Sequence, residues 1–182
     1  PGWWDDLIGP GKAVDTDQFF VVCPNVLGGC RGTTGPGDIN AETGRPFGAD
    51  FPCITIGDIV TVQKMLADHL GISRWRAVIG GSLGGHQAMS WIARYPDSAE
   101  LCVLVASSAR LTSQAIGFDI IGRNAIQTDP HFFGGQYYDK DTRPHTGLAI
   151  ARMLGHITYL STEVMESKFE PNRHDPREIA TE

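Results

Sequence analysis

Residues 77–91, AVIGGSLGGHQAMSW, decide the fold because they join two different patterns through a glycine-rich turn. The first residues are apolar and β-branched, as in a buried strand, and the last ones follow the spacing of an amphipathic helix. Within the turn, residues 80–84 (GGSLG) match G-x-S-x-G, a motif that holds a serine on a sharp strand-to-helix turn. We therefore predict that Ser82 is a nucleophile exposed at the carboxyl edge of a sheet.

The glycines of this motif have a steric explanation, because a tight turn needs neighbours without bulky side chains. The same turn would aim the next helix's amino end, and the backbone amide of Leu83, at the oxygen that turns negative in a tetrahedral intermediate. Two plainer interpretations stay open. One is a turn that serves packing alone, and the other is a turn that binds a phosphate, although no Walker-type lysine follows it.

The segments around the motif predict a parallel α/β sheet. Apolar runs at residues 19–25 (FFVVCPN), 75–81 (WRAVIGG) and 101–108 (LCVLVASS) read as buried strands. The last run has no alternation, which predicts a strand covered on both faces. Helices are expected over residues 55–71, opened by a Thr55–Asp58 capping box, and over residues 83–96. Alternating strands and helices favour a parallel sheet with helices on both sides, and residues 113–126 and 146–161 read as further helices.

Composition restricts the class of protein. The chain has 182 residues and a formal net charge of −6, which argues against nucleic acid or an anionic membrane as a partner. Its apolar runs are too short to cross a bilayer, and a signal segment is not evident at its start. The four cysteines form no CxxC pair, so we expect reduced thiols, no metal site and a cytoplasmic protein. The chain begins at Pro1 and reads as a piece of a longer protein.

A serine nucleophile needs a base, and the sequence offers no convincing one. His86 follows Ser82 on the same expected helix, where its side chain lies in the wrong direction for a base. The other candidates lack a preceding strand and read as surface or pocket residues; they are His131, His145, His156 and His174. We therefore expect the catalytic acid and histidine to lie outside these residues.

Several longer phrases are similar to one family. They are residues 2–36 (GWWDDLIGPGKAVDTDQFFVVCPNVLGGCRGTTGP), 44–60 (GRPFGADFPCITIGDIV), 80–97 (GGSLGGHQAMSWIARYPD), 122–138 (GRNAIQTDPHFFGGQYY) and 147–161 (GLAIARMLGHITYLS). Together they resemble the homoserine O-acetyltransferases, acyltransferases of methionine biosynthesis with the α/β-hydrolase fold. The resemblance implies that Ser82 carries an acetyl group from acetyl-CoA, the co-substrate, to L-homoserine. It implies no metal or further cofactor, and we expect the full-length protein to be a homodimer.

The same resemblance divides the chain and adds two site residues. Residues 1–110 would form the central part of the α/β-hydrolase core, and residues 111–182 the start of a helical cap. In the phrase ARMLGHITYLS, Arg152 and Tyr159 resemble the substrate-binding arginine and tyrosine of the family. Helical spacing places Arg152, His156 and Tyr159 on one face, and an arginine fork suits an amino acid's carboxylate. The alternative is a polar face that simply contacts water.

Three other functions remain open on the sequence alone. A serine esterase uses the same acyl-enzyme but lets water attack it. A homoserine O-succinyltransferase differs only in its donor, and residues 51–56 (FPCITI) favour acetyl over succinyl. A non-catalytic binding module of the same fold is the alternative from another class, since the acid and histidine of a triad are not evident here.

Overall fold

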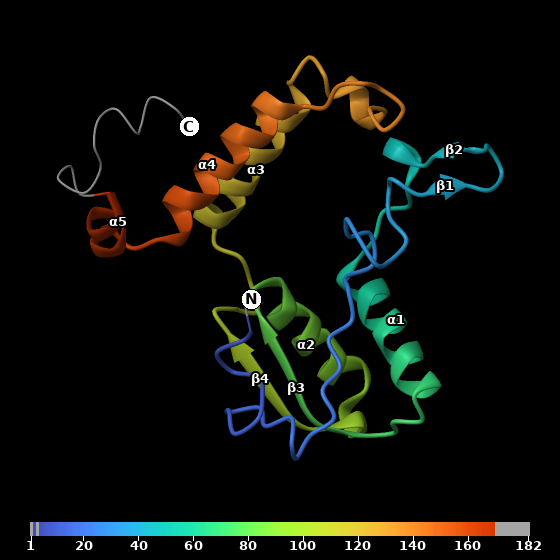
Figure 1. The fold of residues 1–182 in the computed structure, drawn as a ribbon, viewed down its shortest axis with the longest axis vertical. Coiled ribbons are helices and arrows are strands. Elements are labelled where there is room, and N and C mark those ends of the chain that lie inside the picture. The colour runs from blue at the N-terminus through green and yellow to red at the C-terminus, as the bar shows by residue number, and fades with distance from the viewer. Residues whose placement is uncertain (1, 3, 170–182) are drawn as a thin grey trace.

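The computed structural model describes residue 2 and residues 4–169, and it combines an α/β core with a pair of long helices (Figure 1). The helices are α1 (Ile56–His69), α2 (Leu83–Arg94), α3 (Ser113–Gln127), α4 (His145–Tyr159) and α5 (Thr162–Phe169). The strands are β1 (Ile39–Asn40), β2 (Arg45–Pro46), β3 (Trp75–Gly81) and β4 (Ala99–Val105), and short 3₁₀ helices occupy Gly48–Asp50, Pro96–Ser98 and Phe133–Gly135. In this described part, every helix is too short or too polar to cross a membrane.

The sheet formed by β3 and β4 is parallel, as the order of the sequence segments predicts. Its register runs from Trp75 opposite Ala99 to Gly81 opposite Val105. Helix α2 connects the two strands and packs against both of them, as a crossover helix must for parallel neighbours. The carboxyl ends of β3 and β4 therefore meet at one edge, and the chain passes from there to α3 and α4 (Figure 1).

The core of this part lies between α1, α2 and β3. Val60, Ala67 and Trp91 are buried together, and the indole Nε1 of Trp91 donates a hydrogen bond to Ser98 Oγ at 2.7 Å. The expected capping box is present, since Thr55 Oγ1 accepts from the Asp58 amide and the Asp58 carboxylate accepts from the Thr55 amide. It satisfies amides that a helix start leaves without partners, and so fixes where α1 begins.

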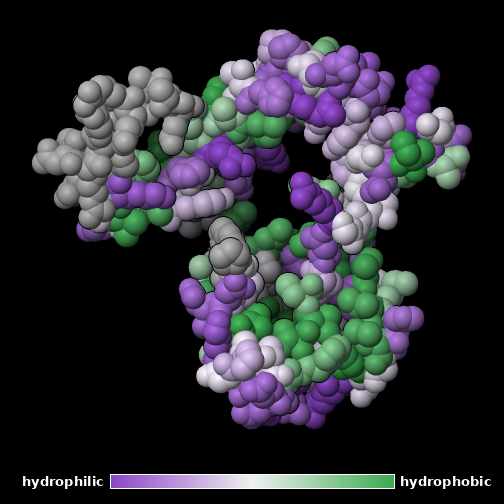
Figure 2. All heavy atoms as spheres, in the orientation of Figure 1, coloured by the Kyte–Doolittle hydropathy of each residue, from purple (hydrophilic) through white to green (hydrophobic). Residues whose placement is uncertain are grey.

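Two expectations about strands are wrong. Residues 19–25 form no strand, because no described segment supplies the backbone partners of a ladder, and Phe20 remains 72% exposed. Strand β4 ends at Val105 rather than Ser108, and its apolar side chains from Leu101 to Val105 are exposed instead of covered on both faces. Among the described helices, α2 alone packs extensively on β4. Figure 2 accordingly shows hydrophobic side chains at the surface of this part of the molecule.

Helices α3 and α4 form an antiparallel pair, and hydrogen bonds connect the end of α3 to the start of α4. The buried carboxylate of Asp129 follows α3 and accepts hydrogen bonds from the Gly147 amide, in the first turn of α4, and from the His131 amide, both at 2.8 Å. These amides, that of Gly147 first, lower the pKa of the Asp129 carboxyl. Gly147 lies so close to α3 that a Cβ there would overlap the Ala125 carbonyl. Helix α4 is thus held in one position along α3.

A side chain at Gly147 is expected to force the two helices apart. We expect Gly147→Ala to lower the free energy of unfolding by about 1–3 kcal/mol, the usual cost of overpacking, as measured by urea denaturation. Gly117→Ala is the matched control, because it also lies in this helix pair but has nothing within 4 Å of an added Cβ. The control should be neutral or stabilising by up to about 1 kcal/mol. Equal effects of the two substitutions would contradict the close approach.

Candidate active site

Ser82 lies on the predicted strand-to-helix turn, between the end of β3 and the start of α2. Its backbone has a φ of 52° and a ψ of −116°, a left-handed conformation that is costly for a residue with a side chain. The Ser82 amide donates to the Val105 carbonyl at 2.9 Å, and the Ser82 carbonyl accepts from Ser107 Oγ and from the Gly85 amide, each at 2.9 Å. The end of β4 and the first turn of α2 therefore hold the strained residue.

The glycines of the motif have different roles. A Cβ at Gly80 would overlap the carbonyl of Gly84, and a Cβ at Gly85 would overlap the side chain of Ser107. Gly84, the last residue of G-x-S-x-G, has nothing within 4 Å of an added Cβ. Steric crowding thus explains Gly80 and Gly85 among the described residues, but it does not explain Gly84.

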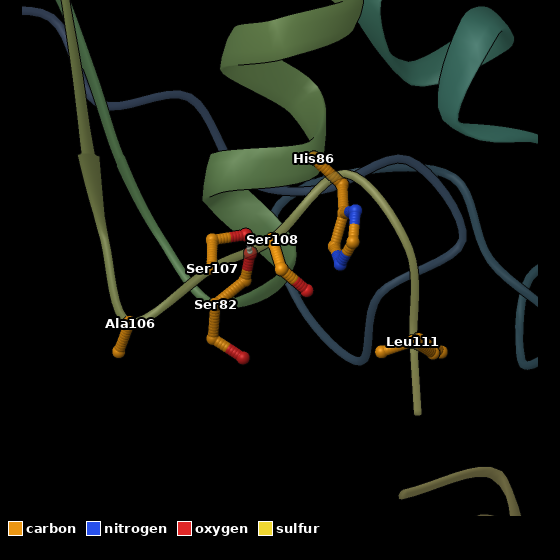
Figure 3. Close-up of a pocket in the computed structure, with 6 residues that line it drawn as sticks. All are labelled: Ser82, His86, Ala106, Ser107, Ser108 and Leu111. Carbon is orange, nitrogen blue, oxygen red and sulfur yellow. Dashed lines mark hydrogen bonds between the residues drawn. The ribbon is translucent and has the colours of Figure 1, made fainter. Parts of the chain in front are cut away.

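Ser82 opens onto a cavity of about 300 Å³ at the carboxyl edge of the sheet (Figure 3). The cavity is lined by Ser82, His86, Ala106, Ser107, Ser108 and Leu111. No described residue makes a hydrogen bond to the Ser82 hydroxyl, so this oxygen is available to a ligand. The Leu83 amide, which the sequence predicts as an oxyanion donor, is the first amide of α2 and also makes no hydrogen bond within the described part.

The structure places His86 differently from the expectation that its side chain points away from Ser82, because both residues line one cavity. His86 lines the cavity, but its ring is not hydrogen-bonded to Ser82. His131 lies beside Asp129, and His145 and His156 belong to α4. His131, His145 and His156 do not line the cavity, and His174 lies outside the described residues. Among residues 2 and 4–169 there is also no cluster of side chains that could hold a metal ion.

Arg152 and Tyr159 lie on α4 and do not line the Ser82 cavity. Both are exposed, Tyr159 at 84%, and the described residues include no ion-pair partner for the Arg152 guanidinium. The ring of His156 lies on the same face, with its Nδ1 3.0 Å from the Arg152 carbonyl oxygen. Tyr159 borders a second cavity, of about 410 Å³, between α3 and α4. In the described structure the candidate site residues therefore lie in two places: Ser82 at the edge of the sheet, and Arg152 and Tyr159 on the helix pair.

Sequence reasoning missed the cavity residues that follow β4. Ser107, Ser108 and Leu111 follow the observed end of β4, which runs parallel to β3, whereas the predicted strand included both serines. Because the carboxyl ends of parallel strands share an edge, their position beside Ser82 follows from the topology. The signal was available in the residues ASSAR (106–110), but it depended on knowing that β4 is the immediate neighbour of β3.

Crowding at Gly80 makes this position intolerant of a side chain. We expect Gly80→Ala to lower the free energy of unfolding by at least about 3 kcal/mol, at or above the upper end for overpacking, because the obstacle is backbone. Gly84→Ala is the control, since it lies in the same motif with open space around it, and should change stability by less than about 1 kcal/mol. Chemical denaturation of both variants checks this. A tolerated alanine at Gly80 would contradict the observed turn.

Comparison with known proteins adds relatives along the whole chain. A bifunctional methionine biosynthesis protein MetXA/MetW of Rhodopirellula baltica is 72% identical and aligns with 100% of this chain but 30% of its own length. A homoserine O-succinyltransferase of Alkalilimnicola ehrlichii is 58% identical and aligns with 93% of this chain and 44% of its own length. The chain therefore spans less than half the length of these relatives.

Solved structures agree with these matches. A homoserine O-acetyltransferase from Bacillus anthracis has a TM-score of 0.84 at 33% identity, over 100% of this chain and 50% of its own. An esterase has a TM-score of 0.86 at 38% identity, over 92% of this chain and 47% of its own. A family model described as alpha/beta hydrolase fold matches residues 1–173. These matches confirm the resemblance found in the sequence: the chain belongs to the alpha/beta hydrolase fold family and is similar within it to homoserine O-acyltransferases.

Proposed function

We propose that the full-length protein containing this chain transfers an acyl group from a coenzyme A thioester to the hydroxyl of L-homoserine, a step of methionine biosynthesis. The observation that supports this is the strained Ser82, exposed on a cavity at the sheet edge, in a chain similar to proteins named for that activity. Acyl-CoA is a co-substrate, and the scheme needs no metal or further cofactor.

The reaction proceeds through an ester on Ser82. Its Oγ attacks the thioester carbon, the C–S bond breaks, and the serine proton leaves with coenzyme A as the thiol. The homoserine hydroxyl then attacks the ester carbon, O-acylhomoserine departs, and Ser82 regains a proton. In both steps the carbonyl oxygen becomes negative, and the Leu83 amide at the start of α2 donates to it. The base that moves these protons belongs to the full-length protein.

We assign substrate recognition to α4, within a cap formed by residues 111–182. Arg152 has an exposed guanidinium without a described ion-pair partner, which suits the carboxylate of homoserine. Tyr159 is exposed on the same face and offers a hydroxyl for a further hydrogen bond.

The exposed apolar side chains along α3 and α4 also offer a contact surface for the proposed homodimer; they include Ile121, Leu148, Met153 and Ile157.

The sequence favours acetyl-CoA as the donor. Succinyl-CoA is the second candidate, because the relative from A. ehrlichii is named a homoserine O-succinyltransferase. The two donors share every step at Ser82 and differ only at the far end of the acyl group. Donor choice therefore depends on the cavity and not on the turn.

An acyl group on Ser82 is directly observable. Full-length protein mixed with acetyl-CoA or succinyl-CoA alone should gain one acyl group on the Ser82 peptide in mass spectrometry, and Ser82→Ala should gain none. Adding homoserine should remove the group. An esterase would lose the group equally fast without homoserine, and a binding module would never gain it. Acylation of homoserine with Ser82 always unmodified would contradict the covalent route.

The role of Arg152 predicts a selective loss. Arg152→Leu should raise the homoserine KM and lower kcat/KM by about 30-fold or more, a loss of about 2–4 kcal/mol of transition-state stabilisation, because the bound carboxylate would lose its charged partner. Formation of the acyl-enzyme should stay nearly unchanged, because it precedes homoserine binding. Arg74→Leu is the matched control, since Arg74 is also exposed but lies before β3, at the opposite end of the sheet. Unchanged homoserine kinetics in Arg152→Leu would remove this assignment.

A further inference from the structure

His86 occupies a distinctive position in the cavity of Ser82. It lies one turn further along α2, and its half-buried ring is part of the cavity lining. In Figure 3 the His86 ring and the side chains of Ser82 and Ser108 border the same open space, with Leu111 on its far side. The ring makes no hydrogen bond to any described residue, so its N–H is available to whatever fills the cavity.

The other lining residues cannot compensate an anion. They provide three hydroxyls, from Ser82, Ser107 and Ser108, and apolar surface from Ala106 and Leu111. Ser107 already donates its hydroxyl hydrogen to the Ser82 carbonyl at 2.9 Å, and Ser108 donates to the Arg110 carbonyl at 2.8 Å. Within the described lining, His86 is thus the only side chain that can carry positive charge.

The spacing along α2 fits a particular acyl chain. One helical turn rises about 5.4 Å, and the two carboxyl carbons of a succinyl group are roughly 4 Å apart across three C–C bonds of about 1.5 Å. A succinyl group on Ser82 that extends toward His86 is thus comparable in length to one turn of α2, and its far carboxylate can accept a hydrogen bond from the ring. An acetyl group ends one bond from its carbonyl and leaves the ring without a partner.

We propose that His86 selects the acyl donor, by donating a hydrogen bond to the far carboxylate of a succinyl group carried on Ser82. The proposal rests on the function proposed above and names its donor specificity. Bond changes at Ser82 are the same for both donors, because His86 contacts only the unreactive end of the chain. Charge-assisted hydrogen bonds to carboxylates are among the stronger ones in proteins, so the geometry favours succinyl-CoA over the acetyl-CoA expected from the sequence.

The test compares two donors on the full-length protein. We expect His86→Leu, which removes the donor and keeps an apolar bulk, to lower kcat/KM for succinyl-CoA by about tenfold or more. The same variant should lose much less kcat/KM for acetyl-CoA, so that the ratio of the two donors falls, and urea denaturation should show that the variant is folded. His86→Gln should recover part of the succinyl activity, because its amide N–H₂ still donates. His69→Leu, the same change at an exposed histidine of α1, should affect neither donor.

Each outcome separates the alternatives. An equal loss for both donors in His86→Leu and His86→Gln would overturn the proposal, because His86 would then support the common chemistry at Ser82. An unchanged donor ratio in both variants would overturn it as well. Failure of the unmodified protein to acylate homoserine from either donor would instead overturn the proposed function itself, and with it this inference.

Discussion

The backbone of Ser82 is the constraint on which the rest of the structure depends. A positive φ at a residue with a side chain costs of order 1–3 kcal/mol, and here hydrogen bonds from β4 and α2 hold it. Because the Ser82 amide bonds to Val105, the register of β3 against β4 and the position of the turn are linked. The positions of the cavity, of its serines and of the first amide of α2 all depend on the backbone conformation of Ser82.

Local signals predicted most of the core, whereas contacts between distant segments did not follow from the sequence. The turn at Ser82 and the capping box of Thr55 and Asp58 depend on residues close together in the sequence, so the starts of α1 and α2 and both ends of β3 agree with expectation. The two helices end at His69 and Arg94, earlier than predicted. Residues 19–25 have strand-like composition, but a strand exists only where a neighbour pairs with it. The cavity residues after β4 were missed for the same reason, since a spatial neighbour had to be known first.

The helix pair shows that a long connection between two helices can still fix the positions of their side chains. Between α3 and α4 the chain makes a long excursion, yet the carboxylate of Asp129 and the close approach of Gly147 fix where α4 starts. Every residue on α4 then has a defined height along α3, including Arg152 and Tyr159. The recognition proposed for this helix therefore depends on a junction more than one helical turn away from either side chain.

The division between backbone and side chains in the Ser82 turn affects how new activities can arise. The turn is built from glycines and from hydrogen bonds to the main chain of Ser82, one of them from the Ser107 hydroxyl. The other wall side chains, those of His86, Ser108 and Leu111, take no part in these bonds. Substitutions in that wall can change the substrate at little cost to folding, whereas Gly80 and Gly85 leave no such freedom. This separation fits the similarity of one chain to both an esterase and acyltransferases, and it indicates which positions a directed-evolution library should vary.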